Sequence, residues 1–141
     1  MKLPDVNIFV GAYREDAVDH ARHRKWLTEL VNGDEPFGLS EMILSAFVRI
    51  VTNARIFDPP TPADTALVFA DKLRSSPACV IVSPGARHWD IFSRLCREAG
   101  ARGNLVADAY LAALAIESGS EWVTMDGDFA RFPSLRWARP F

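Results

Sequence analysis

The sequence predicts an α/β domain whose mostly parallel sheet is covered by helices on both faces. Short apolar segments alternate along the chain with longer segments of helical pattern, which is the order expected for a parallel sheet with crossover helices. The chain has 141 residues, of which 49% are hydrophobic, and this suits one compact domain with a single core. Because no repeat, low-complexity tract or polar linker divides the chain, we expect residues 1–141 to form a single domain.

The first predicted element is a short buried strand over residues 5–10. Pro4 is compatible only with the beginning of this strand, because proline cannot donate a ladder hydrogen bond, and Gly11 ends it. A helix is predicted from Asp16 to about Val31, because its apolar positions fall on one side and its charged positions on the other. Asn32-Gly33 then provides a helix end.

A second strand is predicted over residues 37–39, and a second helix follows from Glu41 to about Thr52. Ser40 suits the N-cap of this helix, and an acidic residue is favourable in its first turn. The rigid proline-rich turn at residues 59–62 leads into a third helix over about residues 63–74.

The second half of the chain continues the alternation of strands and helices. Three strands are predicted here, over residues 79–82, 121–124 and 135–137. An amphipathic helix that ends at Gly100 is expected to bury Trp89 in the core. A further helix opens at Gly103-Asn104 and ends at Gly119, since glycine is common just beyond helix ends.

Asp108 is the only charged residue in the apolar stretch from Asn104 to Ile116. An ionised carboxylate among apolar neighbours is costly unless a partner compensates it, and no Lys, Arg or His lies within a turn or two along this helix. A bound cation is the natural partner. The alternative is a salt bridge across the fold to an arginine, for which the candidates are Arg49, Arg87 and Arg131.

Four separate segments offer a carboxylate where an apolar element begins, ends or is interrupted. These carboxylates belong to Asp5, Glu41, Asp108 and Asp126, with Asp128 beside the last. Acidic side chains from remote segments commonly converge to form a metal pocket, and Mg²⁺ and Mn²⁺ need only a few such oxygen ligands because they retain water. Asp126 follows the predicted strand 121–124, at the end of a strand where sites form in open α/β sheets. The pattern therefore predicts a magnesium or manganese site suited to phosphodiester hydrolysis.

Polar neighbours are expected to orient these carboxylates. Asn104 precedes Asp108 by four residues and so lies on the same helical face, while Thr124 is placed to hold Asp126 or to touch a phosphate. The arginine candidates for phosphate contacts are Arg131, which follows the Asp126 loop most closely, and then Arg87 and Arg49.

The net charge of −2 does not exclude a polyanionic partner. Setting aside the five suspected pocket carboxylates turns this charge into +3, and a bound divalent ion would reverse the sign of the pocket. No stretch resembles a membrane-spanning helix or a secretory signal. Cys79 and Cys96 are too few and too far apart for a disulfide scaffold. We therefore expect a cytoplasmic protein with reduced thiols and no membrane partner.

Five motifs together resemble those of the PIN-domain ribonucleases, and more closely those of the VapC toxins of bacterial toxin–antitoxin pairs. The resemblance covers the whole chain, and the order and spacing of its acidic positions are specific. The motifs are Leu3-Pro-Asp5-Val-Asn7-Ile-Phe9, the predicted helical segment Asp19–Leu27, Ser40-Glu41, Gly103-Asn104-Leu-Val-Ala-Asp108-Ala-Tyr-Leu-Ala112, and Thr124-Met-Asp126-Gly-Asp128-Phe-Ala-Arg-Phe132.

The resemblance implies a three-layer α/β/α fold and an endoribonuclease that depends on Mg²⁺ or Mn²⁺. It implies that the catalytic metal ligands are Asp5, Glu41, Asp108 and Asp126, that Asp128 is a supporting or occasional ligand, and that Asn7, Asn104 and Thr124 are supporting residues. Asn7 stands where many members of this family have Ser or Thr. The implied partners are an RNA substrate, a cognate antitoxin whose C-terminal segment occupies the acidic cleft, and a second copy of the chain in a homodimer.

Other functions remain open from the residues alone. A phosphomonoesterase would use Asp5 as a covalent nucleophile, but that chemistry normally needs a second aspartate where this chain has Asn7. A non-enzymatic module would use the acidic pocket to hold a basic peptide. His20 and His23 have the spacing of two zinc ligands on a helix, although no neighbouring cysteine or acid completes a tetrahedral set.

Overall fold

The computed structural model describes every residue from 1 to 141 and contains one five-stranded sheet. The strand order is β3-β2-β1-β4-β5, and each neighbouring pair is parallel. All five strands are short: β1 (Lys2–Pro4), β2 (Phe37–Leu39), β3 (Cys79–Ile81), β4 (Glu121–Val123) and β5 (Trp137–Ala138). The predicted α/β class with a parallel sheet is therefore confirmed.

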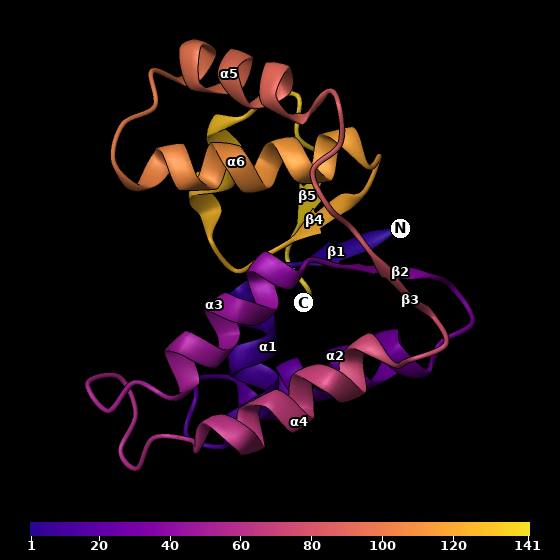
Figure 1. The fold of residues 1–141 in the computed structure, drawn as a ribbon, viewed down its shortest axis with the longest axis vertical. Coiled ribbons are helices and arrows are strands. Elements are labelled where there is room, and N and C mark those ends of the chain that lie inside the picture. Colours follow the sequence, from indigo (N-terminus) through magenta and orange to yellow (C-terminus); the bar gives the residue numbers. More distant parts are fainter.

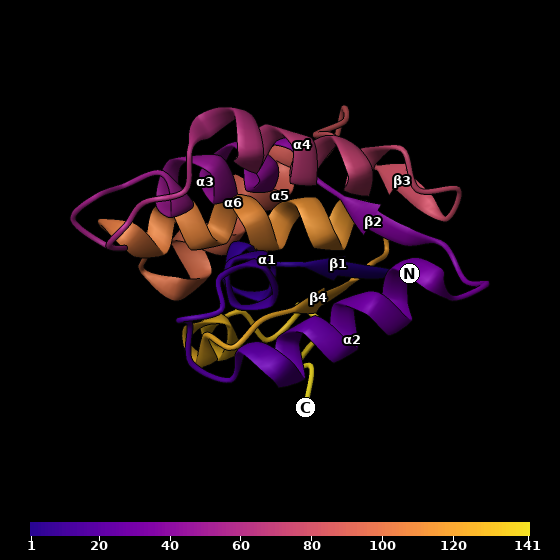
Figure 2. The ribbon, with the colours of Figure 1, turned by 90° about the horizontal axis from the view of Figure 1, so that it is seen from below.

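Helices connect the strands and cover both faces of the sheet. They are α1 (Val6–Tyr13), α2 (His20–Asn32), α3 (Glu41–Val51), α4 (Ala63–Arg74), α5 (His88–Ala99), α6 (Asn104–Glu117) and the 3₁₀ helix η1 (Gly127–Arg131). Figure 2 shows α2 on one side of β1 and β4, with α3, α4 and α6 on the other. Helix α5 packs along the outside of α6 (Figure 1). This is the predicted three-layer arrangement.

The core forms where the apolar faces of the helices meet the sheet. In α3 the buried positions are Ile43, Leu44, Phe47 and Val51, which recur with the helical period and make one apolar stripe. Strands β1, β2 and β4 lie at the centre of the sheet, and their apolar side chains are almost completely buried. Central parallel strands lose solvent on both faces, which explains their apolar composition. None of the helices has the length and apolar character needed to cross a bilayer.

The predicted strand over residues 5–10 is wrong. Strand β1 ends at Pro4, and residues from Val6 onward form α1, because Asp5 acts as an N-cap whose carboxylate accepts a hydrogen bond from the Val6 amide. Pro4 stands at the end of the strand rather than its beginning, and the Asp5 amide donates the next ladder hydrogen bond, 2.8 Å to the Val123 carbonyl. Gly11 consequently lies inside a helix.

Two other sequence expectations also need correction. Helix α2 begins at His20 rather than at Asp16, after Asp19 in a left-handed conformation with φ 56°. Trp89 was expected in the core, but it is 66% exposed, since the buried face of α5 carries Ile91 and Leu95 instead. The other helices and strands lie within a few residues of their predicted positions.

Candidate active site

Strands β1 and β4 end side by side and bring Asp5 and Thr124 together. Their parallel register pairs Pro4 with Val123, so the next residue of each strand emerges at the same edge of the sheet. Sites in open α/β sheets form at this carboxyl edge. Asp5 is 4% exposed and Thr124 is completely buried.

Hydrogen bonds hold the Asp5 carboxylate in one orientation. Its Oδ1 accepts from the Val6 amide at 2.6 Å, and its Oδ2 accepts from Thr124 Oγ1 at 2.7 Å and from Asn7 Nδ2 at 3.1 Å. Burial raises the pKa of Asp5, while the hydrogen bonds from Thr124 and Val6 act in the opposite direction. Asp5 is therefore positioned by its neighbours rather than by an ion pair.

Asn7 and Thr124 also fix the loop that carries Asp126. The Asn7 side chain donates to Thr124 Oγ1 at 3.0 Å and accepts from the Met125 amide at 3.1 Å. Thr124 Oγ1 additionally accepts from the Asp126 amide at 3.0 Å. The hydroxyl and the amide side chain thus tie the end of β4 to the beginning of α1.

Asp108 enters the same site from α6. Burial raises the pKa of Asp108 to about 6, and the negative charges of Asp126, Asp5 and Asp128 contribute further to this increase. Asp108 takes part in none of the ion pairs of the structure, so the alternative of a salt bridge to Arg49, Arg87 or Arg131 is not realised. Aspartates from three segments therefore act on one another electrostatically at one edge of the sheet.

This arrangement fits a hard divalent cation. The side chains as they stand do not form a group of three ligands close enough to enclose an ion, but Mg²⁺ is usually held by one or two carboxylates with water completing its shell. All of the donor atoms are oxygens. The charges that act on Asp108 are all negative, and a cation would relieve this repulsion. Asp5, Asp108 and Asp126 are the residues suited to hold it.

The Glu41 side chain is paired with an arginine rather than grouped with these aspartates. Its carboxylate pairs with Arg74 of α4, with Oε2 3.0 Å from Arg74 Nη2, and it remains largely exposed. Glu41 is also absent from the charges that shift the pKa of Asp108 or Asp5. The structure therefore places Glu41 at the start of α3 with its carboxylate occupied by an arginine.

The remaining predicted residues have weaker connections to the site. Asp128 is exposed, and its amide donates to Asp126 Oδ1 at 2.9 Å. Asn104 is exposed and makes no side-chain hydrogen bond to Asp108. The three arginine candidates, Arg49, Arg87 and Arg131, are all exposed and unpaired.

Sequence reasoning missed Arg139, which follows β5. Its guanidinium Nη2 lies 3.7 Å from the position that a Cβ atom would take at Gly127, between the two aspartates of the η1 loop. The predicted strand over residues 135–137 begins and ends too early, since β5 spans Trp137–Ala138. With the correct register, the rule that parallel strands present their carboxyl ends together would have identified this arginine.

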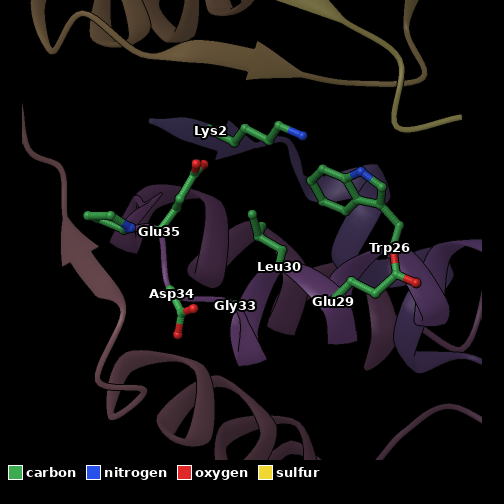
Figure 3. A pocket seen from close by; sticks show the side chains of 8 residues that line it. Lys2, Trp26, Glu29, Leu30, Gly33, Asp34 and Glu35 are labelled. Carbon is green, nitrogen blue, oxygen red and sulfur yellow. The ribbon is translucent and has the colours of Figure 1, made fainter.

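A separate cavity of about 270 Å³ lies near the opposite end of the strands (Figure 3). It is bounded by α2 and by the segments that enter β1 and β2, and its lining includes Lys2, Trp26, Glu29 and Asp34. The Lys2 amine lies 5.6 Å from the centroid of the Trp26 ring, a cation–π contact within the chain itself. None of the predicted site residues lines this cavity.

His20 and His23 do not form a zinc site. The His20 Nδ1 atom lies 2.9 Å from the Gly11 carbonyl oxygen, whereas the His23 ring is buried against Gly11 and the Phe141 ring. The two imidazoles therefore serve the packing of α1 against α2.

Comparison with known proteins agrees with the fold. Residues 2–135 match the PIN domain family. Ribonuclease VapC43 of Mycobacterium tuberculosis is 45% identical over 140 residues, which are 99% of this chain and 95% of VapC43. Ribonuclease VapC25 of the same organism is 40% identical over 140 residues, covering 99% of both chains.

Solved structures share the fold at lower sequence identity. VapBC2 from Rickettsia felis, bound to a promoter DNA fragment, superposes with a TM-score of 0.71 at 19% identity and covers 98% of this chain and 97% of that one. Mycobacterium tuberculosis VapC20, a toxin that cleaves the sarcin-ricin loop, gives a TM-score of 0.68 at 16% identity, covering 96% and 99%. Together, the family match and the full-length relatives show that the chain belongs to the PIN-domain family and, within it, to the VapC ribonucleases.

Proposed function

We propose that this chain is an Mg²⁺- or Mn²⁺-dependent endoribonuclease that acts as the toxin of a toxin–antitoxin pair. The observation that carries the proposal is the convergence of Asp5, Asp108 and Asp126 at the carboxyl edge of the sheet, where their negative charges act on one another without a paired cation. Full-length relatives named ribonucleases support the choice of RNA as substrate.

In this proposal the aspartates hold the metal and the polar network holds the aspartates. Asp5, Asp108 and Asp126 are the principal ligands, with Asp128 as an additional one. The bound ion supplies charge stabilisation at the phosphate oxygens and lowers the pKa of an attacking water. Asn7 and Thr124 keep Asp5 and the Asp126 loop in register, through the hydrogen bonds that join β4 to α1.

Glu41 is a further proposed ligand, and its carboxylate must first leave Arg74. The ion pair between them is exposed on both sides, and exposed pairs contribute only about 0–1 kcal/mol. Glu41 can therefore exchange Arg74 for a divalent ion at a small cost in free energy.

Cleavage of RNA with the purified protein tests the proposal. Mg²⁺ or Mn²⁺ should support endonucleolytic cleavage that leaves 5′-phosphate ends, and EDTA or Asp108→Asn should abolish it. Asp71→Asn is the matched control, because it removes the same charge from an exposed position of α4. Undiminished cleavage by the Asp108 variant would remove this residue from the site. A pocket that binds no divalent ion in calorimetry, yet holds an arginine-rich peptide, would favour the binding module instead.

We further propose that the protein is a homodimer that associates through an apolar face of α3, α5 and α6. This face is lined by Met42, Phe92, Val106, Tyr110 and Leu111, which surround a depression of about 470 Å³. The neighbouring Trp89 ring lies 5.2 Å from Phe92 and is mostly exposed. Apolar surface of this kind is usually covered in soluble proteins. Light scattering should show a dimer for the parent and a monomer for Val106→Glu. The control is Val68→Glu, at an exposed position of α4.

The remaining proposed partner is a cognate antitoxin. The proposed place of action is the cytoplasm, where the RNA substrate is found. The acidic site is electrostatically suited to a basic segment of such a partner. Production of the chain together with the product of an adjacent small gene should suppress RNA cleavage. Cleavage that continues in the presence of a stable complex would contradict inhibition at the acidic site.

A further inference from the structure

The register of the sheet places Arg139 at the same edge as the acidic residues. Strand β5 is parallel to β4, with Trp137 opposite Trp122 and Ala138 opposite Val123. The Thr124 amide continues the ladder by donating to the Ala138 carbonyl at 3.0 Å. Arg139 is the next residue of β5, just as Thr124 is the next residue of β4, so both leave the sheet at its carboxyl edge.

The Arg139 side chain then reaches the loop of the two aspartates. Its Nη2 atom lies 3.7 Å from where a Cβ atom would stand at Gly127. Gly127 separates Asp126 from Asp128, yet Arg139 forms no ion pair with either carboxylate. The side chain is exposed. A permanent positive charge therefore stands beside the acidic site with its hydrogen-bond donors uncommitted.

Contacts on both sides keep this segment in place. Before β5, Arg136 Nη2 donates to the Gly119 carbonyl at 3.1 Å. After Arg139, the Phe141 ring lies 4.9 Å from the His23 ring and 4.0 Å from the Arg22 guanidinium carbon. The backbone of Arg139 is thus fixed by neighbours that do not involve its own side chain.

Two other arginines, unlike Arg139, have a carboxylate partner. Arg74 is paired with Glu41, and Arg14 with Asp16. Arg139 combines proximity to the η1 loop, an anchored backbone and a free guanidinium. A guanidinium presents a planar set of donors that matches a phosphate group better than a point charge does.

We infer that Arg139 contacts a backbone phosphate of the RNA strand, next to the bond held at the acidic site. The inference rests on the proposed nuclease function and deepens it by naming a substrate-binding residue. The acidic cluster alone repels RNA, and a phosphate contact by Arg139 supplies a local attraction that positions the strand. Arg139 thereby acts on RNA binding, while the aspartates hold the metal.

The test compares Arg139→Ala and Arg139→Lys with the parent, using an RNA that the parent cleaves. Arg55→Ala is the matched control, since Arg55 is exposed and unpaired on the loop that follows α3. Loss of a charged contact should raise KM by about tenfold or more with a smaller change in kcat. The slope of log affinity against log salt should fall by about 0.7 for one lost contact to a single strand. Arg139→Lys should recover part of the affinity.

Metal binding separates substrate contact from a structural role. Removal of a positive charge beside the aspartates should leave Mn²⁺ affinity unchanged or increase it, as measured by calorimetry without RNA. Weaker Mn²⁺ binding by Arg139→Ala would show that the arginine supports the loop instead, and would overturn the inference. If the parent cleaves RNA and Arg139→Ala has the same KM and salt slope as the parent, the inference is overturned while the nuclease proposal remains intact. A parent that cleaves no RNA would overturn both.

Discussion

Thr124 Oγ1 donates a 2.7 Å hydrogen bond to Asp5 Oδ2, although the two residues are 119 positions apart in the chain. The same oxygen accepts hydrogen bonds from the Asn7 side chain and the Asp126 amide. One buried hydroxyl therefore links the beginning of α1 to the η1 loop and sets the relative positions of two proposed metal ligands.

Replacement of Thr124 by Val should damage both stability and activity. The valine has a similar shape but leaves the partly buried Asp126 amide without its acceptor. It also removes one of the two acceptors of the Asn7 side-chain amide and one of the three donors to the Asp5 carboxylate. We expect the free energy of unfolding to fall by about 1–3 kcal/mol, the cost of unsatisfied buried polar groups. Urea unfolding and RNA cleavage measure the two effects.

Thr124→Ser is the control for this prediction. Serine retains the hydroxyl and loses only a methyl group, so cleavage should remain close to the parent level while stability decreases modestly. If Val and Ser variants cleave RNA equally well, the hydrogen bonds of this hydroxyl do not position the ligands.

Asp108→Asn should stabilise the metal-free protein in a pH-dependent manner. The pKa of Asp108 in the folded chain is about 6, above the ordinary value of 3.8, so the carboxylate destabilises the fold as pH rises between these values. Above about pH 6 the variant should be more stable by about 1–2 kcal/mol, a figure reduced from the full shift because the group is partly exposed. The difference should vanish near pH 4. Urea unfolding with EDTA across this range measures it.

Divalent ions should reverse that order of stability. A cation that binds the folded protein stabilises it by mass action, and the parent has a carboxylate ligand that the Asp108 variant lacks. Repetition of the unfolding experiment with Mn²⁺ should therefore favour the parent. Equal stabilisation of the two proteins would contradict a ligand role for Asp108.

The sequence predicted most helices well because their apolar stripes are long. The prediction of the first element failed for an identifiable reason. Apart from Asn7, Val6–Val10 is apolar and fits either a strand or a helix, and the choice between them depends on Asp5. Its carboxylate caps α1, while its amide completes the ladder to Val123 across the sheet. That second contact is set by a segment more than a hundred residues away and has no local signal in the sequence.

In the candidate site too, some residues can be identified from the sequence and others cannot. Asp108 could be identified from sequence because a single charge in an apolar helix needs an explanation. The ion pair of Glu41 with Arg74 and the approach of Arg139 to Gly127 depend on how α3 meets α4 and how β5 aligns with β4. Such contacts follow from the packing of remote elements, which the sequence does not reveal. Proximity along the chain selects Arg131, and its contact with RNA stays a prediction.

Glu117→Gln should loosen the turn that precedes α5. The Glu117 carboxylate accepts from the Gly85 amide at 2.6 Å and from the Arg87 amide at 2.9 Å, and these hydrogen bonds lower its pKa. Its stabilising contribution is present above the unfolded pKa and is lost as pH falls through the folded value. Amide chemical shifts of Gly85 and Arg87 should titrate below the ordinary pKa of 4.5 in the parent. In the Gln variant they should not titrate, and a retained titration would assign it to another group.

Gly11→Ala should destabilise the contact between α1 and α2. A Cβ atom at Gly11 would lie 2.5 Å from His23 Cδ2 and 2.7 Å from His23 Cγ, and the buried His23 ring is covered by Phe141. Alanine gains about 1 kcal/mol over glycine in a helix, whereas overpacking costs about 1–3 kcal/mol. Because the ring has little room to move, we expect a net loss of stability in urea unfolding.

The combination with His23→Ala decides whether the clash is the cause. Removal of the imidazole opens the space above Gly11, so Gly11→Ala should be favourable by about 0.5–1 kcal/mol in the His23→Ala background, in accordance with its helix propensity. The double-mutant cycle should therefore show a coupling that changes the sign of the glycine substitution. If Gly11→Ala destabilises both backgrounds equally, the imidazole is not the group that requires glycine at this position, and the close approach of α1 to α2 must depend on another contact.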